Sequence, residues 1–316
     1  MQATLLCILG PTASGKTAVG IGVARTLGGE IVSADSVQVY KGMDIGSAKP
    51  TPDEQNSVRH HMIDCIDIDD SGFSCAAYAD MASEIIRDLA AGGKQPILVG
   101  GSGLYVDSLV KPLSFAVPRN DALRKELEIS YDDDPEAFYD MFCRIDHDSA
   151  AHLHKNDRKR IIRAVEVFEI TGKTIGENNR EASLPARFPS VRFGLQWDRR
   201  TLYDRINRRV DEMMAHGFPE EAQMILDKGY DMSLPAMQSI GYKQMFAYLK
   251  GRCKLDEAVE SIKQETRRYA KRQMTWFRAD HEIRWIDMSM IHEAGEAAAE
   301  ICSQWRALND QYKHIR

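Results

Sequence analysis

The chain has 316 residues, and 41 lysines and arginines against 47 aspartates and glutamates give it a formal net charge of −6. A hydrophobic fraction of 43% provides enough apolar surface to offset chain entropy, which excludes a disordered protein, and the length predicts one large domain or two smaller ones. No apolar run approaches the roughly 18 residues that cross a bilayer. Six scattered cysteines without a C-x-x-C pair argue against a zinc site and a disulfide framework, so we expect a cytoplasmic protein.

The first hundred residues alternate short apolar segments with segments whose apolar residues recur at helical spacing. The expected strands and helices are, in turn, residues 4–9, 30–33, 62–64 and 96–99, and residues 16–27 and 73–91. Alternation of this kind predicts a parallel sheet flanked by helices. Right-handed crossovers then place the carboxyl ends of the strands, and any ligand site, along one edge of the sheet.

The pattern changes near residue 111. Residues 118–190 have a helical pattern, and the chain is expected to return to the sheet at 191–195. We therefore predict a core made of residues 1–117 and 191–316, interrupted by a helical insertion domain over 118–190. Beyond Trp197 we expect two long helices rich in basic residues, a last strand and a closing helix, over 199–216, 255–278, 281–286 and 293–308.

The segment after the first expected strand satisfies the phosphate-loop pattern G-x-x-x-x-G-K-[ST] and opens the first expected helix. Glycines in this loop let backbone N–H groups point at phosphate oxygens, and the helix N-terminus adds a partial positive charge. Lys16 would reach the terminal phosphate, and the Thr17 hydroxyl is placed to coordinate Mg²⁺. The predicted pyrophosphate-binding residues are Gly10, Pro11, Thr12, Ala13, Ser14, Gly15, Lys16 and Thr17.

The loop pattern does not say which molecule carries the phosphates. An N-K-x-D motif, typical of regulatory GTPases, is missing from the sequence, and the strand over 96–99 ends in glycines rather than the acid of a motor ATPase. A small-molecule kinase stays open, because Asp35 follows the second expected strand. At that edge Asp35 is a candidate metal ligand, base or hydrogen-bond acceptor, and the alternative is an ordinary turn or helix-cap residue.

Several segments closely resemble the tRNA dimethylallyltransferase family, in the order in which that family carries them. They are the phosphate loop, residues 33–50, 60–64, 100–105, 160–167 and 239–242, and the segment K-R-Q-M-T-W-F-R over 271–278. The segments around Asp35 and over 271–278 are specific, whereas the phosphate loop is generic. Three positions depart from the usual family pattern: Ser47 and Ser102 replace threonine, and Gln238 stands where some members have arginine.

The resemblance implies transfer of a dimethylallyl group from dimethylallyl pyrophosphate to N6 of the adenosine immediately 3′ of the anticodon, in tRNAs that read codons beginning with U. It implies an α/β fold like that of P-loop NTPases, with an all-helical insertion that contacts tRNA. The loop then binds the donor's pyrophosphate with Mg²⁺ as cofactor. We expect Asp35 to act as the base that accepts an N–H of the adenine amine, with Ser102 as a second hydrogen-bond partner of that amine. By resemblance Arg209 is the arginine that stabilises the leaving group, although spacing alone favours Arg205 or Arg208 equally.

The implied partners are the tRNA anticodon stem-loop and the prenyl donor, and we expect a monomer. The residues expected to contact tRNA are Asp35, Ser36, Val37, Gln38, Ser102, Arg124, Lys159, Arg160, Ile161, Ile162, Arg163, Gln238, Ser239, Ile240, Gly241, Tyr242, Lys243, Lys271, Arg272, Gln273, Met274, Thr275, Trp276, Phe277 and Arg278. For the basic segments the alternative is a solvated helix face, and for Trp276 and Phe277 it is core packing. His60 and His61 are expected to hydrogen-bond structurally rather than to bind metal.

Three other functions remain open on sequence grounds. They are a nucleoside or metabolite kinase with Asp35 as base, an enzyme that prenylates free AMP, and a non-catalytic RNA-binding protein with a phosphate loop. Each differs from tRNA prenylation in the substrate that it consumes or in its need for Asp35, so labelled substrates and one mutation separate them.

Overall fold

A computed structural model describes residues 4–314 except 71, 114, 116, 183 and 184. The chain divides into two compact units: residues 1–110 with 187–316, and residues 111–186. The sequence prediction placed these boundaries at 117/118 and 190/191. Each unit has a hydrophobic core of its own.

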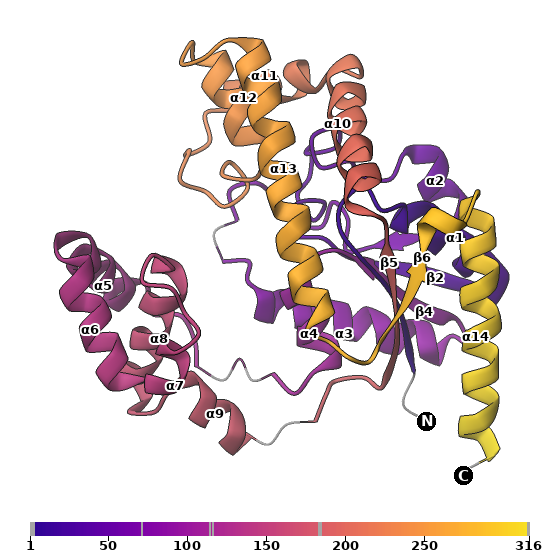
Figure 1. The fold of residues 1–316 in the computed structure, drawn as a ribbon, viewed down its shortest axis with the longest axis horizontal. Coiled ribbons are helices and arrows are strands. Elements are labelled where there is room, and N and C mark those ends of the chain that lie inside the picture. The colour runs from indigo at the N-terminus through magenta and orange to yellow at the C-terminus, as the bar shows by residue number, and fades with distance from the viewer. Residues whose placement is uncertain (1–3, 71, 114, 116, 183–184, 315–316) are drawn as a thin grey trace. The chain divides into compact units, whose positions relative to one another are not determined.

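The first unit is built on a six-stranded parallel sheet with the strand order β3-β2-β4-β1-β5-β6 (Figure 1). In chain order the strands are β1 (Leu5–Leu9), β2 (Gly29–Ala34), β3 (His60–His61), β4 (Gln95–Gly100), β5 (Ser190–Gln196) and β6 (Ile283–Asp287). An α/β architecture with a parallel sheet flanked by helices was predicted from the alternating pattern, and it is confirmed.

Helices cover both faces of this sheet. On one side α1 (Lys16–Leu27) packs against the strands and against α14 (Ala294–His314), and on the other α3 (Cys75–Ala91) packs against β2, β4 and α4 (Gly103–Val110). The remaining helices of this unit are α2 (Pro52–Ser57), α10 (Arg199–Ala215), α11 (Phe218–Asp227), α12 (Tyr242–Leu249), α13 (Leu255–Arg278) and the short 3₁₀ helix η1 (Met288–Met290).

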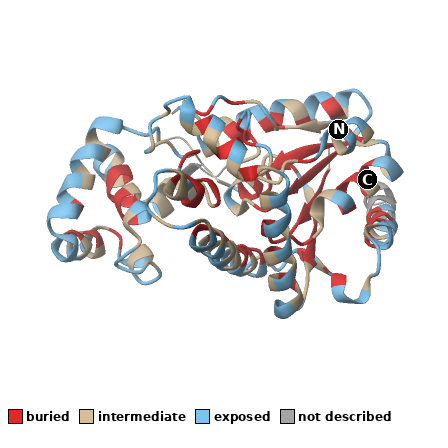
Figure 2. Cartoon of the chain, turned by 90° about the horizontal axis from the view of Figure 1, so that it is seen from above, coloured by how far each residue is buried: buried red, intermediate tan, exposed pale blue. Residues whose placement is uncertain are grey.

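The sheet is buried on both faces, as Figure 2 shows by the buried strands beneath partly exposed helices. In β1, Leu6 and Ile8 belong to the core shared with α1 and α14, whereas Cys7 points toward Tyr78 of α3. Burial raises the pKa of the Cys7 thiol to about 12. Continuous apolar strands of this kind are expected where helices lie on both sides of a parallel sheet.

One strand prediction was wrong. The third strand is β3, not residues 62–64, because Met62 and Asp64 have left-handed backbone conformations with φ of 59° and 51°. A residue at positive φ cannot continue a strand. The two histidines of β3 do hydrogen-bond: His60 Nδ1 lies 2.8 Å from the Val58 carbonyl oxygen, and His61 Nε2 lies 2.6 Å from Glu30 Oε2.

The described residues of the second unit form helices joined by loops, with no strand among them. Its helices are α5 (Asp121–Asp133), α6 (Pro135–Ile145), α7 (His147–Ala150), α8 (Arg158–Thr171) and α9 (Ile175–Ala182). Side chains of α5, α6 and α8 form its core, which includes Tyr131, Phe138, Phe142, Ile161 and Val165. The absence of a strand among these residues agrees with the helical pattern of the sequence.

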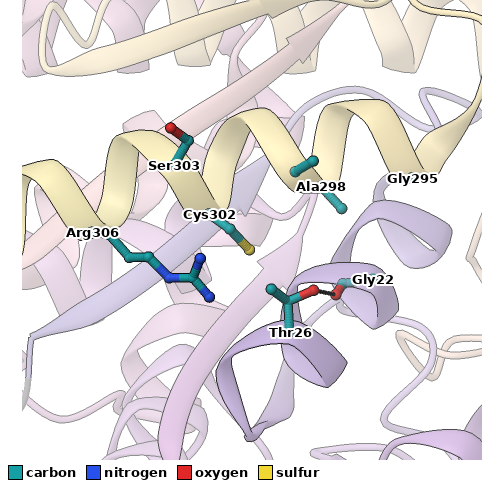
Figure 3. A pocket seen from close by; sticks show the side chains of 8 residues that line it. Gly22, Thr26, Gly295, Ala298, Cys302, Ser303 and Arg306 are labelled. Carbon is teal, nitrogen blue, oxygen red and sulfur yellow. Dashed lines mark hydrogen bonds between the residues drawn. The ribbon is translucent and has the colours of Figure 1, made fainter.

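A shallow groove separates α1 from α14 (Figure 3). Small residues let the two helices approach closely, because a Cβ added to Gly22 would lie 2.8 Å from the Cβ of Ala298. Thr26 donates to the Gly22 carbonyl rather than across the groove. None of the predicted site residues lines this groove. Among the described helices none is both long enough and apolar enough to traverse a bilayer.

Candidate active site

Three loops begin side by side at the carboxyl edge of the sheet. Leu9, Gly100 and Ala34 are register partners across β1, β4 and β2. The residues that follow them start the predicted phosphate loop, the loop that carries Ser102 and the loop that carries Asp35. Strand order therefore brings together three segments that lie far apart in the sequence, at the edge where parallel sheets bind ligands.

The phosphate-loop segment has the backbone that its glycines allow. Gly10 has φ of 148°, and a Cβ there would lie 2.8 Å from the Leu195 carbonyl oxygen. Gly15, with φ of 96°, caps the N-terminus of α1, so its left-handed conformation also favours glycine. Lys16 folds back over the loop, and its Nζ donates to the Pro11 carbonyl at 2.6 Å.

The Lys16 ammonium is poised to receive an anion. Burial and the nearby positive charge of Arg209 lower its pKa to about 7, and Asp35 opposes this shift. An ammonium group that is desolvated and repelled by a like charge gains most from a bound polyanion. The diphosphate-binding role of Lys16 stays a prediction.

Asp35 lies directly after β2 and caps the following turn. Its Oδ1 accepts the backbone N–H groups of Val37 and Gln38 at 2.9 and 3.3 Å. The turn-cap role that the sequence left as an alternative is therefore real, but it occupies only one carboxylate oxygen among the described contacts. The same carboxylate interacts electrostatically with Lys16 and Arg209, so Asp35 lies close to both cationic groups.

Ser102 links the loop after β4 to the loop after β2. Its backbone N–H donates to the Ala34 carbonyl at 3.0 Å, and its Oγ accepts the Ser36 N–H at 3.0 Å. The Ser102 hydroxyl is therefore bonded to the residue that follows Asp35 in the sequence. Serine in place of the family's threonine keeps this bridge intact, because the bridge uses the hydroxyl and not the missing methyl group.

The structure distinguishes between the three arginines of α10 that sequence spacing alone could not rank. Arg209 on α10 donates to the Ala48 carbonyl at 3.4 Å and lies close enough to Lys16 and Asp35 to influence them. Arg205 donates to the Ala13 carbonyl at 2.8 Å, whereas Arg208 is exposed and pairs with Glu212 at 3.7 Å. Arg209 thus meets the other candidates, Arg205 supports the phosphate loop from outside, and Arg208 points away.

Sequence reasoning missed two residues of this region, Trp197 and Tyr269. Trp197 donates from Nε1 to the Ser14 carbonyl at 3.0 Å, and the Arg205 guanidinium stacks 4.5 Å from the centre of its ring. Tyr269 on α13 lies near Asp35, and burial followed by that negative charge raises its pKa to about 12.

The segment over 271–278 divides between two faces of α13. Lys271, Arg272, Thr275 and Arg278 are exposed, so their predicted RNA contacts stay predictions. Gln273 and Phe277 are buried, and Phe277 has the core position that was its alternative. The Trp276 indole donates to Asp107 Oδ2 at 3.1 Å, which gives it a structural partner inside the protein. Met274 is half-buried.

The basic segment of the second unit is also divided. Lys159 and Arg160 are exposed, while Ile161 and Ile162 are core residues whose side chains present no surface to RNA. Arg124 and Arg163 both pair with the fully buried Glu166. Burial would raise the pKa of Glu166, but these two arginines and the Asn120 N–H hold it below its usual range. Both guanidinium groups are thus committed to a buried carboxylate.

The segment over 238–243 also contains both exposed and buried side chains. The exposed Gln238 donates to the Met232 carbonyl at 2.6 Å, so it turns back onto its own loop. Tyr242 is fully buried, whereas Lys243 is exposed. Ser239 donates to the Ala236 carbonyl, Ile240 is half-buried, and the N–H of Gly241 donates to Gln244. RNA contact for this segment stays a prediction.

A magnesium ion held between phosphates and one or two protein oxygens suits this edge of the sheet. Within the described ranges no cluster of three or more histidine, cysteine, aspartate or glutamate side chains is arranged to hold a metal. Thr17 is the second residue of α1, directly after Lys16, and Asp35 supplies the nearby carboxylate. Mg²⁺ commonly takes few protein ligands together with waters and substrate phosphates, so this donor set fits it.

Comparisons with known proteins show which family this chain resembles. A sequence model described as IPP transferase matches residues 38–280. The tRNA dimethylallyltransferases of Pelotomaculum thermopropionicum and Geobacter sulfurreducens are 44% and 46% identical, over 94% and 90% of this chain and 95% and 91% of theirs.

Solved structures of related enzymes are similar to this chain in fold. The tRNA isopentenylpyrophosphate transferase of Bacillus halodurans superposes with a TM-score of 0.75 and 38% identity over 99% of both chains. A eukaryotic dimethylallyltransferase acting on tRNA gives a TM-score of 0.78 and 25% identity over 99% of this chain and 80% of the other. The chain therefore belongs to the IPP transferase family.

Proposed function

We propose that the protein transfers a dimethylallyl group from dimethylallyl pyrophosphate to N6 of the adenosine immediately 3′ of the anticodon, in tRNAs that read codons beginning with U. Its close relatives are named tRNA dimethylallyltransferases. The observation that carries the assignment is the meeting of Lys16, Arg209 and Asp35 at one edge of the sheet. Two cationic side chains that can bind a negatively charged leaving group therefore lie beside a carboxylate that can accept a proton from a nucleophile.

The leaving group is pyrophosphate. As the bond between the allylic carbon and its oxygen breaks, that oxygen keeps the electron pair and gains negative charge. Loop N–H groups, Lys16 and Arg209 oppose this charge from preorganised positions, which is where electrostatic catalysis is strongest. Bound Mg²⁺, held by Thr17 and the donor's phosphates, would supply further neutralisation of that charge.

The nucleophile is the exocyclic N6 amine of adenine, which is weak because its lone pair is delocalised into the ring. Asp35 would accept one N–H of this amine and take its proton as the new C–N bond forms. The Oδ1 atom holds the turn, so Oδ2 is the oxygen that this role uses. The Ser102 hydroxyl accepts the N–H of Ser36, the residue that follows Asp35, and would also hydrogen-bond the adenine.

The RNA must deliver an unstacked base to this edge. Anticodon-loop bases are single-stranded and are extruded at low energetic cost, so we expect the adenine to be flipped into the site. Exposed cations on α12, α13 and the helical insertion would contact phosphates and position the loop; they include Lys243, Lys271, Arg272, Lys159 and Arg160. We further propose that the protein acts as a cytoplasmic monomer.

Labelled substrates test this function. Dimethylallyl pyrophosphate and ATP are each offered with total tRNA, and we expect label from the prenyl donor alone to enter RNA. ATP turnover without RNA modification would instead indicate a kinase. Competition between AMP and an anticodon stem-loop then separates a tRNA-modifying enzyme from one that prenylates the free nucleotide, and we expect the stem-loop to be preferred.

A further inference from the structure

The side chain of Gln273 joins two of the three loops at the active edge. Its Oε1 accepts the backbone N–H of Thr12 in the phosphate loop at 2.9 Å, and its Nε2 donates to the Gly101 carbonyl at 2.9 Å. Gln273 is 7% exposed, and a Cβ added to Gly101 would clash with its amide nitrogen. The amide is therefore a close-fitting bridge within the protein.

A second contact from the same helix holds α4, which begins directly after this loop. The ring of Trp276 lies against the backbone of Gly103, where an added Cβ would clash with it, and its Nε1 donates to Asp107 on α4. Gln273 and Trp276 are three residues apart on α13, so they share a face. The helix α13 thus contacts the loop after β4, the helix α4 that follows this loop, and the phosphate loop.

The loop after β4 carries Ser102, which is bonded to the Asp35 loop through Ser36. The phosphate loop carries the groups that would hold the leaving group. The distance between these loops therefore sets the distance between the donor's carbon and the adenine amine. Rates of such transfers depend steeply on that separation, and a misplacement of about 1 Å lowers a rate by about 100-fold.

We propose that Gln273 is a positioning residue that sets the separation between the pyrophosphate cradle and the adenine-binding loops, a proposal that rests on the proposed function. Its effect falls on the transfer step rather than on substrate binding. The Thr12 N–H is already engaged by Gln273, so loss of the amide removes no donor that faces the pyrophosphate. The resemblance predicted an RNA contact for Gln273, whereas its buried bridge gives it a different role.

The test compares Gln273→Met with the matched control Gln264→Met, which alters an exposed glutamine on the same helix. Methionine keeps the length of the side chain but forms neither hydrogen bond. With both substrates saturating, we expect kcat of Gln273→Met to fall about 10- to 100-fold. The KM values, and the Kd for inorganic pyrophosphate, should stay close to those of the wild type, as should every constant of Gln264→Met.

A second variant reaches the same bridge from its other end. Gly101→Ala places a methyl group against the Gln273 amide and should also lower kcat more than KM. An unchanged kcat in correctly folded Gln273→Met, judged by circular dichroism, would overturn the proposal. So would a rise of KM for the donor with kcat preserved. Failure of the wild type itself to transfer the prenyl group would refute the proposed function instead, so the two failures are distinguishable.

Discussion

The Tyr242 hydroxyl donates a 2.6 Å hydrogen bond to the carboxylate of Glu221, and both side chains are buried. The same carboxylate accepts three backbone N–H groups, those of residues 44–46, at distances of 2.9, 2.7 and 3.0 Å. This loop continues to Ala48, whose carbonyl accepts the hydrogen bond from Arg209. Glu221 therefore anchors the loop against which a site arginine rests.

Removal of this anchor should destabilise the protein strongly. Glu221→Ala leaves three backbone donors and one hydroxyl without their acceptor, so we expect the free energy of unfolding to fall by about 3 kcal/mol or more. Tyr242→Phe removes one bond and should lower it by about 1–2 kcal/mol. Urea unfolding measures both. The exposed neighbour Glu220 is the control, and an effect of Glu221→Ala no larger than that of Glu220→Ala would contradict the anchoring role.

Pyrophosphate binding should be linked to proton uptake by Lys16. In the empty site its pKa is about 7, because of burial and Arg209, and a bound polyanion raises that pKa. Above pH 7 the Lys16 amine of the free protein must therefore gain a proton when pyrophosphate binds. The contribution of Lys16 to pyrophosphate affinity consequently weakens as pH rises. Well below pH 7 Lys16 is already charged, so the uptake disappears.

Calorimetry in buffers of different ionisation enthalpy measures this uptake, with inorganic pyrophosphate and no divalent cation. Lys16→Met is the control, because it reports the protons exchanged by pyrophosphate itself. At pH 8 we expect the wild type to take up more protons than Lys16→Met, with a difference that approaches about one proton. Equal uptake by the two proteins at pH 8 would show that Lys16 is charged before the anion arrives.

The two neighbouring arginines of α10 should behave differently. Arg209→Gln removes a preorganised charge beside the leaving group and should lower kcat by about 100- to 1000-fold. Arg208→Gln alters an exposed arginine that pairs only with Glu212 among the described contacts, so its rate should stay near that of the wild type. Steady-state kinetics with saturating tRNA compares them. A larger loss in Arg208→Gln would reassign the leaving-group arginine.

Exposed cations on α13 should contribute to RNA affinity through phosphate contacts. The double variant Lys271→Ala with Arg272→Ala should bind the anticodon stem-loop more weakly, and its affinity should depend less steeply on salt. Each lost phosphate contact lowers the slope of log K against log salt concentration by about 0.7 for single-stranded RNA. The exposed Lys228, directly after α11, provides a control. An unchanged slope in the double variant would place the RNA elsewhere.

Local patterns predicted the regular elements well. The helices over 16–27 and 255–278 have the bounds that their apolar spacing indicated. Local patterns failed where the backbone leaves ordinary regions, as at Met62 and Asp64, whose positive φ ends the strand expected there. The short helices α2 and α4 were also missed, since six or eight residues give too little periodicity for a confident pattern.

Some predicted site residues could be placed from local sequence patterns, and others could not. Motif spacing placed the phosphate loop and Asp35, because both follow strands whose order puts their ends side by side. Spacing could not rank Arg205, Arg208 and Arg209, since the choice depends on how α10 lies against the sheet. Nor could it show that Gln273 bridges residues 261 and 172 positions away, because contacts at that range depend on tertiary packing.

The central claim is that Asp35 assists adenine N6 while the phosphate loop holds the departing pyrophosphate. Mass spectrometry of nucleosides from tRNA incubated with dimethylallyl pyrophosphate tests it, with wild type beside Asp35→Asn. Asparagine keeps the Oδ1 acceptor that holds the turn and loses only the charge and basicity. We expect N6-dimethylallyladenosine from the wild type, about 100-fold less or lower from Asp35→Asn, and equal tRNA affinity for both. Full product from Asp35→Asn would contradict the claim.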